Sequence, residues 1–432
     1  MLALILSASA CATYEPAPLD PSVILKGLRA LSVPDSLPEP EPRPAEESAS
    51  KVEREAARAF DASNGLSVVE LIALGVTYNP ELAASRAAVD VAGAQLVQAG
   101  LLPDPTVGWD LNEGNLQVAL PLLRPDERDS REAVAESRIA QVRWELLRDE
   151  WQLARDVNLA TLELLGVRDR AVLNAELERI AEQTQEFFDR AQSLGAATGL
   201  ERELAAIQAA DTRLRTVRLR VDERRAEQAL NALIGLPPEK RLVLENTVAL
   251  PTSLPEATTS APEMTERALR ERPDLQILLA AYQQTESELR LAVAQQWPLL
   301  SIGTTVQLTP GIFSDFNDPA IRSARLERER MARRVEAAVH EIRAEVHDAV
   351  AALEQSRLSM ELLERELAPR LSEALRLVEL SVQAGHVTAS DVLLAQGQVL
   401  DAQVRMLDAR IEAAKRDAVA RWVAANTLEG RP

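Results

Sequence analysis

Residues 126–193 decide the fold class, and they read DERDSREAVAESRIAQVRWELLRDEWQLARDVNLATLELLGVRDRAVLNAELERIAEQTQEFFDRAQS. This stretch contains no proline and a single glycine, Gly166, so it holds no strong helix breaker. One continuous helix of this length extends for about 100 Å, several times the width of a small domain. Apolar and small side chains recur in it at spacings of three and four residues, which is typical of the seam of a coiled coil: Trp144, Leu147, Trp151, Ala154, Val157, Thr161 and Leu164.

The C-terminal half carries a second long helical stretch of the same kind. Leu371, Leu375, Val378 and Val382 repeat the coiled-coil spacing, and Pro369 just before them is expected to kink or loosen the helix. Aromatic residues make up only 3% of the chain and charged residues 27%, while alanine and leucine dominate the 46% apolar fraction. This composition favours long helices packed through small side chains over a compact α/β core.

Two copies of one pattern divide the chain. The segment Asn79-Pro80-Glu81-Leu82 recurs as Arg272-Pro273-Asp274-Leu275, and the offset of 193 residues stays constant over the next 25 residues. Such a repeat indicates two tandem structural units of similar design. We expect the first unit to span residues 63–245 and the second to span residues 256–432.

Each half also contains a segment with the two-residue alternation of β-strands, between its medium helix and its long helix. These segments are residues 107–122 and 301–308. Alternating apolar and polar faces are typical of barrel strands between lipid and water, and equally of a soluble hairpin with one buried face. Their placement at one end of a long rod favours barrel strands. Because only residues 309–317 separate the second hairpin from the next helix, the fourth strand is expected to be very short or incomplete.

The N-terminal residues have the features of a processed leader. Cys11 is the single cysteine, so an internal disulfide is impossible. Residues 1–10 are apolar and end in Ala8-Ser9-Ala10, which resembles a bacterial lipoprotein signal. We therefore expect a signal at residues 1–11 with Cys11 lipidated; the alternative is a small buried thiol near a frayed terminus. Residues 12–62 follow as a proline-rich linker, which we expect to be extended and non-helical.

The charge of the chain excludes some functions and leaves others open. Its net charge is −19 and no basic face is evident, which argues against a nucleic-acid partner. An acidic excess fits a conduit that attracts cations, and it equally fits the solvated surface of helices. No segment outside the leader approaches the roughly 18 consecutive apolar residues of a membrane-spanning helix. If the protein crosses a membrane, it must do so with strands closed into a barrel.

Catalytic motifs are missing from the sequence. His340 and His347 are seven residues apart and share a helix face, but no zinc-protease spacing is present. No phosphate-binding loop follows a strand, and no nucleophile motif occurs. We therefore predict that the chain is not an enzyme and that it needs no metal or other cofactor.

Together these motifs resemble those of the TolC family of outer-membrane factors. The resemblance covers residues 63–428, and it rests on the order, duplication and spacing of motifs that are individually weak. Besides the two proline motifs at 79–82 and 272–275, they are Gln98-Ala99-Gly100-Leu101-Leu102-Pro103-Asp104-Pro105, Leu233-Ile234-Gly235-Leu236-Pro237, and Ala384-Gly385 followed by Asp391-Val392-Leu393-Leu394-Ala395-Gln396.

The resemblance implies a mainly α-helical protein with a small β part that functions as a homotrimer. Each chain would give four strands to a shared transmembrane β-barrel, and long antiparallel helices to a periplasmic α-barrel tunnel. The family exports drugs, metal ions or proteins together with a periplasmic adaptor and an inner-membrane pump. A lipid-anchored channel subunit in the outer membrane is the function that this resemblance implies.

The resemblance also implies a site at the two helix-to-helix turns. The family's tip motifs, which contact the adaptor, correspond here to two turns around the glycines of residues 195 and 385. Because a close helix reversal needs a residue that tolerates positive φ, these glycines can equally be turn residues and nothing more. The expected adaptor-binding residues are Leu194, Gly195 and Ala196 in the first turn, and Ala384, Gly385 and His386 in the second.

Two carboxylates begin the helices that return from these turns. By resemblance, Asp391 matches the family's entrance aspartate, and Glu201 is its counterpart in the first half. Three symmetry-related carboxylates would form a ring that selects cations; the alternative is that both only stabilise a helix N-terminus. The sequence departs from the family at Leu394, where a second aspartate is expected, and at Val382, where a tyrosine is expected. The entrance is therefore expected to be less charged than in the family, and to be closed by contacts other than those of the missing aspartate and tyrosine.

The sequence also fits a second function. A periplasmic coiled-coil scaffold or adaptor without a pore would also consist of long amphipathic helices, but it would not need the duplicated alternating strands. The cargo of a channel also remains open, since both small molecules and metal cations fit the acidic balance.

Overall fold

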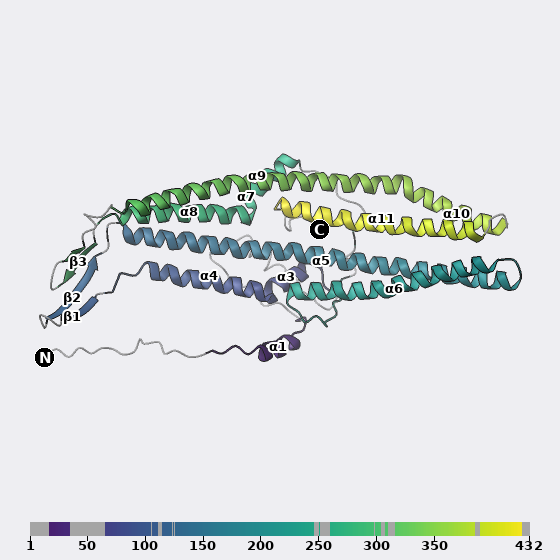
Figure 1. Cartoon of the computed structure of the whole chain (residues 1–432), viewed down its shortest axis with the longest axis horizontal. Helices are drawn as coiled ribbons and strands as arrows, with labels where there is room; N and C mark the ends of the chain where they lie inside the picture. Colours follow the sequence, from purple (N-terminus) through teal and green to yellow (C-terminus); the bar gives the residue numbers. More distant parts are fainter. Residues whose placement is uncertain are drawn as a thin grey trace.

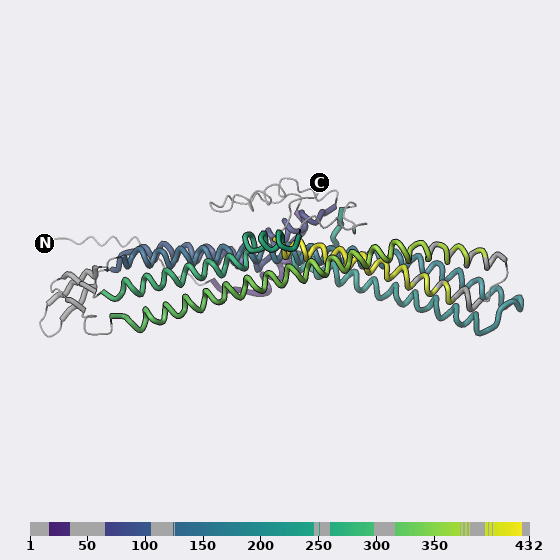
Figure 2. The backbone as a smooth tube through the Cα atoms, turned by 90° about the horizontal axis from the view of Figure 1, so that it is seen from above, coloured from purple at the N-terminus to yellow at the C-terminus, as the bar shows by residue number. Residues whose placement is uncertain are grey.

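The structure is a computed structural model, and it is a long, slender rod (Figures 1 and 2). Strands lie at one end, helix turns lie at the other end, and the long helices run lengthwise between them (Figure 1). The described residues are 17–34, 65–104, 106–110, 115–122, 124, 126–245, 250, 260–297, 299–303, 307–309, 316–384 and 389–425.

The first half of the chain runs from short helices through a hairpin to two long helices. Its elements are α3 (Val68–Tyr78), α4 (Pro80–Ala99), β1 (Thr106–Asp110), β2 (Asn115–Leu122), α5 (Glu127–Ser193) and α6 (Gly199–Ile234). The predicted long helix is confirmed, because α5 is one uninterrupted helix of 67 residues.

The second half repeats this order of elements. They are α7 (Ala261–Glu271), α8 (Pro273–Ala294), β3 (Leu299–Gly303), β4 (Gln307–Thr309), α9 (Asp318–Leu362), the π-helical turn η3 (Leu363–Leu367), α10 (Ala368–Ala384) and α11 (Ala389–Val423). Where the first half has one long helix before its tip turn, the second half has α9, η3 and α10 in series.

The π-helical turn η3 explains how the second half accommodates its proline. Pro369 is the second residue of α10, directly after η3. A proline lacks an N–H group, and its ring clashes with the carbonyl four residues earlier, here that of Arg365 within η3. A widened turn at that place relieves the clash, so the expected local loosening of the helix is confirmed.

The helix α1 (Pro21–Ala30) corrects one prediction. The linker was expected to be extended and non-helical throughout, but ten of its residues form this helix. Asp20 caps it by accepting a 2.8 Å hydrogen bond from the backbone N–H of Ser22, and Pro21 occupies the first helical position. Proline favours that position because its fixed φ suits a helix start, so the proline content alone was a poor guide.

The long helices form a wall one helix thick, and the short helices α3 and α7 pack on it at mid-length. Near the strands, α5 packs against α4 on one side and α8 on the other, and α8 packs against α9. Towards the opposite end, α5 packs against α6 and α11, and α11 packs against α9 and α10. The wall therefore has two edges, one formed by α4 and α6 and the other by α9 and α10 (Figure 1).

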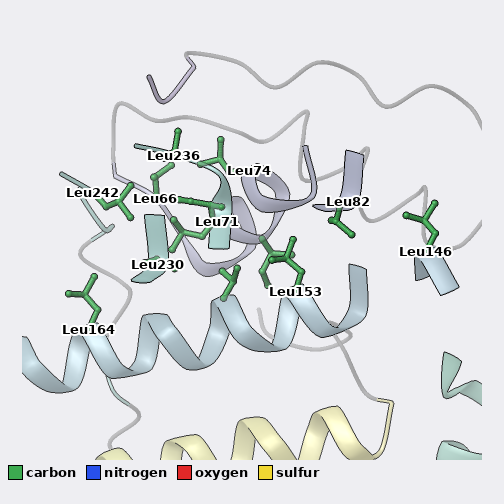
Figure 3. Close-up of a cluster of buried hydrophobic side chains, with 13 residues drawn as sticks. Leu66, Leu71, Leu74, Leu82, Leu146, Leu153, Leu164, Leu230, Leu236 and Leu242 are labelled. Atoms are coloured by element: carbon green, nitrogen blue, oxygen red, sulfur yellow. The ribbon is translucent and has the colours of Figure 1, made fainter. Parts of the chain in front are cut away.

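The largest apolar core lies at mid-length, where α3 covers α5 and α6 (Figure 3). Leu71 and Leu74 of α3, Leu164 of α5, and Leu230 and Ile234 of α6 are all less than 2% exposed. Burial of each of these side chains contributes about 1.5–3 kcal/mol. This core holds the middle of the rod together.

The four strands form one antiparallel sheet in the order β1-β2-β3-β4. Leu120 of β2 pairs with Ile302 of β3, so the sheet joins the two halves of the chain. The fourth strand, β4, has only three residues, as its short connection predicted.

A close approach between α5 and α11 leads to the first testable prediction. A Cβ atom at Gly166 would lie 2.8 Å from Cδ1 of Ile411, which is buried in α11. The substitution Gly166→Ala is therefore expected to destabilise the protein by about 1–3 kcal/mol, because α5 and α11 must separate slightly. The measurement is the thermal unfolding midpoint of the purified protein.

Gly93 of α4 supplies the matched control for this change. A Cβ atom there would be 3.9 Å from Cδ1 of Ile139, an ordinary contact. Gly93→Ala should leave stability unchanged or raise it by up to about 1 kcal/mol through helix propensity. An unfolding midpoint for Gly166→Ala at or above that of the parent protein would contradict the close α5–α11 contact.

Candidate functional site

The turn between α5 and α6 lies at the end of the rod opposite the strands (Figure 1). Gly195 has φ +72°, and the N–H of Ala196 donates a 2.8 Å hydrogen bond to the carbonyl of Ala191. This pattern ends a helix with a glycine in the left-handed conformation. Leu194 is 83% exposed, and a Cβ atom at Gly195 would have nothing within 4 Å. The first predicted tip is therefore an exposed turn, open to contact from outside.

The second predicted tip is described only in part. Ala384 is the last residue of α10, and α11 begins at Ala389. Gly385 and His386 lie outside the described residues. Figure 1 places the ends of α10 and α11 at the same end of the rod as the turn between α5 and α6.

Glu201 has a defined local role. Its carboxylate accepts hydrogen bonds from the backbone N–H of Thr198 at 2.7 Å and from Oγ1 of Thr198 at 2.9 Å, while Thr198 caps the N–H of Glu201. This capping box stabilises the start of α6. Asp391 is the third residue of α11, which places it in the first turn of the returning helix. The side chain of Asp391 lies outside the description, so its place at an entrance stays a prediction.

Exposed apolar side chains mark both edges of the wall near the tips. They are Leu200, Leu204, Ile207, Leu214, Val217 and Val221 on α6, and Leu380, Leu377, Leu362 and Leu358 on α10 and α9. Counted from the turn glycines 195 and 385, the first positions are five residues out on both edges, and the last are 26 and 27 residues out. The extra residue on the second edge matches the one that the π turn η3 inserts. Both edges therefore expose apolar groups over a similar number of residues from the turns.

A buried cation joins the two halves at mid-length. Arg272 is 3% exposed, forms ion pairs with Asp274 at 2.6 Å and with Glu345, and lies 5.7 Å from the ring centres of Trp151 and Trp422. The two rings are stacked at 4.1 Å. Burial lowers the pKa of Arg272, but its hydrogen bonds to the two carboxylates outweigh burial and raise the pKa overall. This cluster fastens the start of α8 to α5, α9 and α11.

The first residue has a different role in each of the two proline motifs, 79–82 and 272–275. Asn79 caps α4 by accepting hydrogen bonds from the N–H groups of Glu81 and Leu82, and its amide donates a 2.8 Å hydrogen bond to the carbonyl of Leu233. Arg272 at the equivalent position makes no side-chain cap of α8. The capping role of Asn79 was readable from sequence, because asparagine before proline favours a helix start; the role of Arg272 was not.

A second buried ionic group lies where the helices meet the strands. Glu127 at the start of α5 is 1% exposed and pairs with Arg131 at 2.7 Å and with Arg124 at 3.3 Å. Burial raises the pKa of Glu127, but the N–H of Arg124 and the charges of Arg131 and Arg124 outweigh it and hold the pKa below its usual value. Nε of Arg124 also donates to the carbonyl of Trp297, which fixes β2 and the approach to β3 side by side.

The two described histidines do not belong to a metal-binding cluster. Among the described residues, no group of three or more metal-binding side chains comes together. His340 and His347 are exposed on α9, and His386 lies outside the description. Within the same residues, none of the helices has both the length and the apolar character needed to cross a membrane.

Comparison with known proteins supports the fold. No protein-family model matches the sequence, and no curated protein matches it. Several solved structures do match. The outer-membrane channel OprN has a TM-score of 0.71 at 15% identity, over 91% of this chain and 98% of that chain. The outer-membrane protein VceC from Vibrio cholerae has a TM-score of 0.69 at 14% identity, over 83% of this chain and 95% of that chain.

The open state of the MtrE outer-membrane channel of Neisseria gonorrhoeae is a third match. Its TM-score is 0.66 at 19% identity, over 83% of this chain and 88% of that chain. Identities this low show a shared fold. The predicted TolC-type helical fold is thereby confirmed.

Proposed function

We propose, from the fold that it shares with solved outer-membrane channels, that this chain is the outer-membrane channel subunit of a tripartite efflux system. The observation that carries the proposal is the wall of helices with two apolar edges. A wall one helix thick that exposes leucine and valine along both edges buries them most simply by joining edge to edge with further copies. Closed rotational symmetry then produces a tube.

The tube would be a homotrimer, as the resemblance to the TolC family implies. The α6 edge of one copy would pack against the α9 and α10 edge of the next, pairing Leu200 with Leu380 and Val221 with Leu358. Three walls would enclose a water-filled tunnel in the periplasm. One chain supplies too few strands to close a pore, so the strands of three chains would form the shared transmembrane β-barrel.

The remaining assignments follow from the same proposal. Residues 63–245 and 256–432 would be two repeats, each contributing one hairpin and one pair of long helices. Lipidation at Cys11 would anchor the chain to the outer membrane, and residues 12–62 would connect this anchor to the rod. The exposed tip turns would contact a periplasmic adaptor, which would link the channel to an inner-membrane pump. The cargo would be small molecules or metal cations.

Asp391 provides the test of the proposed function. If three Asp391 carboxylates ring the entrance, the purified protein should form cation-preferring pores in planar bilayers. Asp391→Asn should reduce the preference for potassium over chloride at least about twofold, because it removes the converging charges. The measurement is the reversal potential across a salt gradient.

Glu201→Gln tests the other predicted entrance carboxylate separately, because that carboxylate also caps its own helix. Its reversal potential should shift less than that of Asp391→Asn. If trimeric protein produces no ionic conductance in planar bilayers, that result would contradict the proposed channel function and favour the scaffold without a pore. Pores whose selectivity is unchanged by Asp391→Asn would remove Asp391 from the entrance while leaving the channel in place.

A further inference from the structure

Large apolar side chains are exposed where the helices give way to the sheet. Leu101 and Leu102 lie just before β1, Trp297 lies just before β3, and Phe316 lies just before α9. All four are more than half exposed. Exposure of such large apolar groups at one level of a rod indicates a surface that is covered in the working protein.

The sheet register places the helix-side ends of β2, β3 and β4 at a common level, while β1 begins three residues farther into the sheet, because Thr106 pairs with Ala119. Leu122 at the end of β2 pairs with Leu300 near the start of β3, and Leu299 pairs with Thr309 at the end of β4. Nδ2 of Asn317 donates a 2.9 Å hydrogen bond to the carbonyl of Ala292, so Phe316 lies beside the end of α8, which Trp297 follows. Residues 101–104 lead from α4 towards β1 at the same end of the rod, where α5, α8 and α9 meet the sheet (Figure 1).

The first part of α9, which begins beside this zone, is rich in arginine. Residues 318–334 at the start of α9 contain six arginines and three acidic residues, in a chain whose net charge is −19. Arg322 is 74% exposed and pairs only with Asp318 of its own helix, at 2.7 Å, among the described residues. Arg325 is exposed and has no ion pair within the described part of the chain. An open groove lies beside them, lined by Phe316, Asp318, Pro319, Arg322, Ser323 and Leu326.

We propose that this zone is a binding collar for anionic phospholipid headgroups. The junction collar consists of Leu101, Leu102, Trp297, Phe316, Arg322 and Arg325. An indole and a phenyl ring beside leucines match the boundary between acyl chains and headgroups, where aromatic side chains are enriched. Guanidinium groups in the same zone pair with the phosphate of an anionic headgroup through two parallel hydrogen bonds.

The inference rests on the proposed function, because it requires the strands to enter the membrane. It names anionic phospholipids as the ligand class. The arginines farther along α9 allow the collar to be distinguished from general positive charge. Arg333 and Arg334 are also exposed on α9, but they lie roughly 12 residues, or about 17 Å, farther from the strands than Arg322. That distance exceeds the screening length of roughly 8–10 Å at moderate salt, so those arginines would not feel the lipid surface.

The experiment uses Trp297 as its reporter. Full-length protein is reconstituted into phosphatidylethanolamine vesicles that contain a minor fraction of phosphatidylglycerol, with bromine on the acyl chains of one lipid or the other. Bromine quenches nearby tryptophan, and subtracting the signal of Trp297→Phe isolates this residue. We expect brominated phosphatidylglycerol to quench Trp297 about tenfold more than its mole fraction predicts.

Two double variants separate the collar from general positive charge. Arg322→Gln with Arg325→Gln should abolish the excess quenching, and Arg333→Gln with Arg334→Gln should retain it. Equal loss in both variants, or equal quenching by both lipids, would overturn the collar while leaving the channel intact. Displacement of brominated phosphatidylglycerol by inorganic phosphate would overturn it in favour of a free-phosphate site.

Two further outcomes are also decisive. Loss of the trimer in Arg322→Gln with Arg325→Gln would reassign these arginines to the contact between copies and overturn the collar. Absence of quenching by either brominated lipid would show that this end of the rod lies away from the bilayer. That result would contradict the proposed function as well.

Discussion

Replacing Leu204 and Val221 together with aspartate is expected to convert the assembled protein into monomers. Both side chains are exposed on the α6 edge of the single chain. If that edge packs against the next copy, each aspartate places an unpaired charge in an apolar contact. The loss of apolar burial alone is about 1.5–3 kcal/mol for each side chain, and burial of an unpaired charge adds to it. The measurement is the molar mass in detergent by light scattering.

Val172 offers a matched control for this variant. It is 72% exposed on α5, a helix that has neighbours of its own chain on both sides and so forms no edge. Val172→Asp should leave the trimer intact. A double variant at Leu204 and Val221 that remains trimeric would show that the α6 edge is free in the assembly.

The second large effect is expected at Gly235, which ends α6 beneath the turn between α3 and α4. Gly235 has φ +77°, and a Cβ atom there would lie 2.4 Å from the backbone oxygen of Tyr78. Gly235→Ala must therefore strain its own backbone and also push away the Tyr78–Asn79 junction. The expected cost is about 2–5 kcal/mol, seen as a large fall in the thermal unfolding midpoint.

Gly195 separates the two causes of this loss. Its φ of +72° is nearly the same, but a Cβ atom there would meet nothing within 4 Å. Gly195→Ala should therefore cost only the backbone term of about 1–2 kcal/mol. Equal losses at the two positions would mean that the close approach to Tyr78 is unimportant.

The parts of the fold that depend on local sequence were predictable. The unbroken run before Ser193 predicted α5. Of the predicted seam, Trp151, Val157, Thr161 and Leu164 are buried, whereas Trp144, Leu147 and Ala154 are only partly buried. The repeated proline motifs predicted a second set of elements in the same order. In these cases the decisive information lies within one helix or one turn, where periodicity and helix breakers act directly.

The parts that depend on which helices become neighbours were not predictable. Arg272 meets Glu345, 73 residues later, and the stacked rings of Trp151 and Trp422 come from α5 and α11. No spacing rule connects such distant positions. The helix α1 was missed for a different reason, since the prolines around it were interpreted as signs of extended chain although Pro21 favours a helix start.

The candidate site was predictable only at the level of the turns. Glycines 195 and 385 marked the tips, and Gly195 has the positive φ expected of such a turn. The apolar edges were not foreseen, because the same leucine spacing describes a seam buried within one chain and a seam left for another copy. Only the three-dimensional arrangement distinguishes the two, by showing that α6 and α10 lie at opposite edges of the wall.

Disulfide crosslinking between Val221→Cys and Leu358→Cys tests most directly whether these edges meet. A disulfide requires the two Cα atoms to approach within about 7 Å, which a single wall does not allow because its edges lie on opposite sides. We predict a covalent trimer on a non-reducing gel from the double variant, and none from either single variant or from Val172→Cys with Leu358→Cys. Monomers alone, from protein that is trimeric before denaturation, would contradict the account.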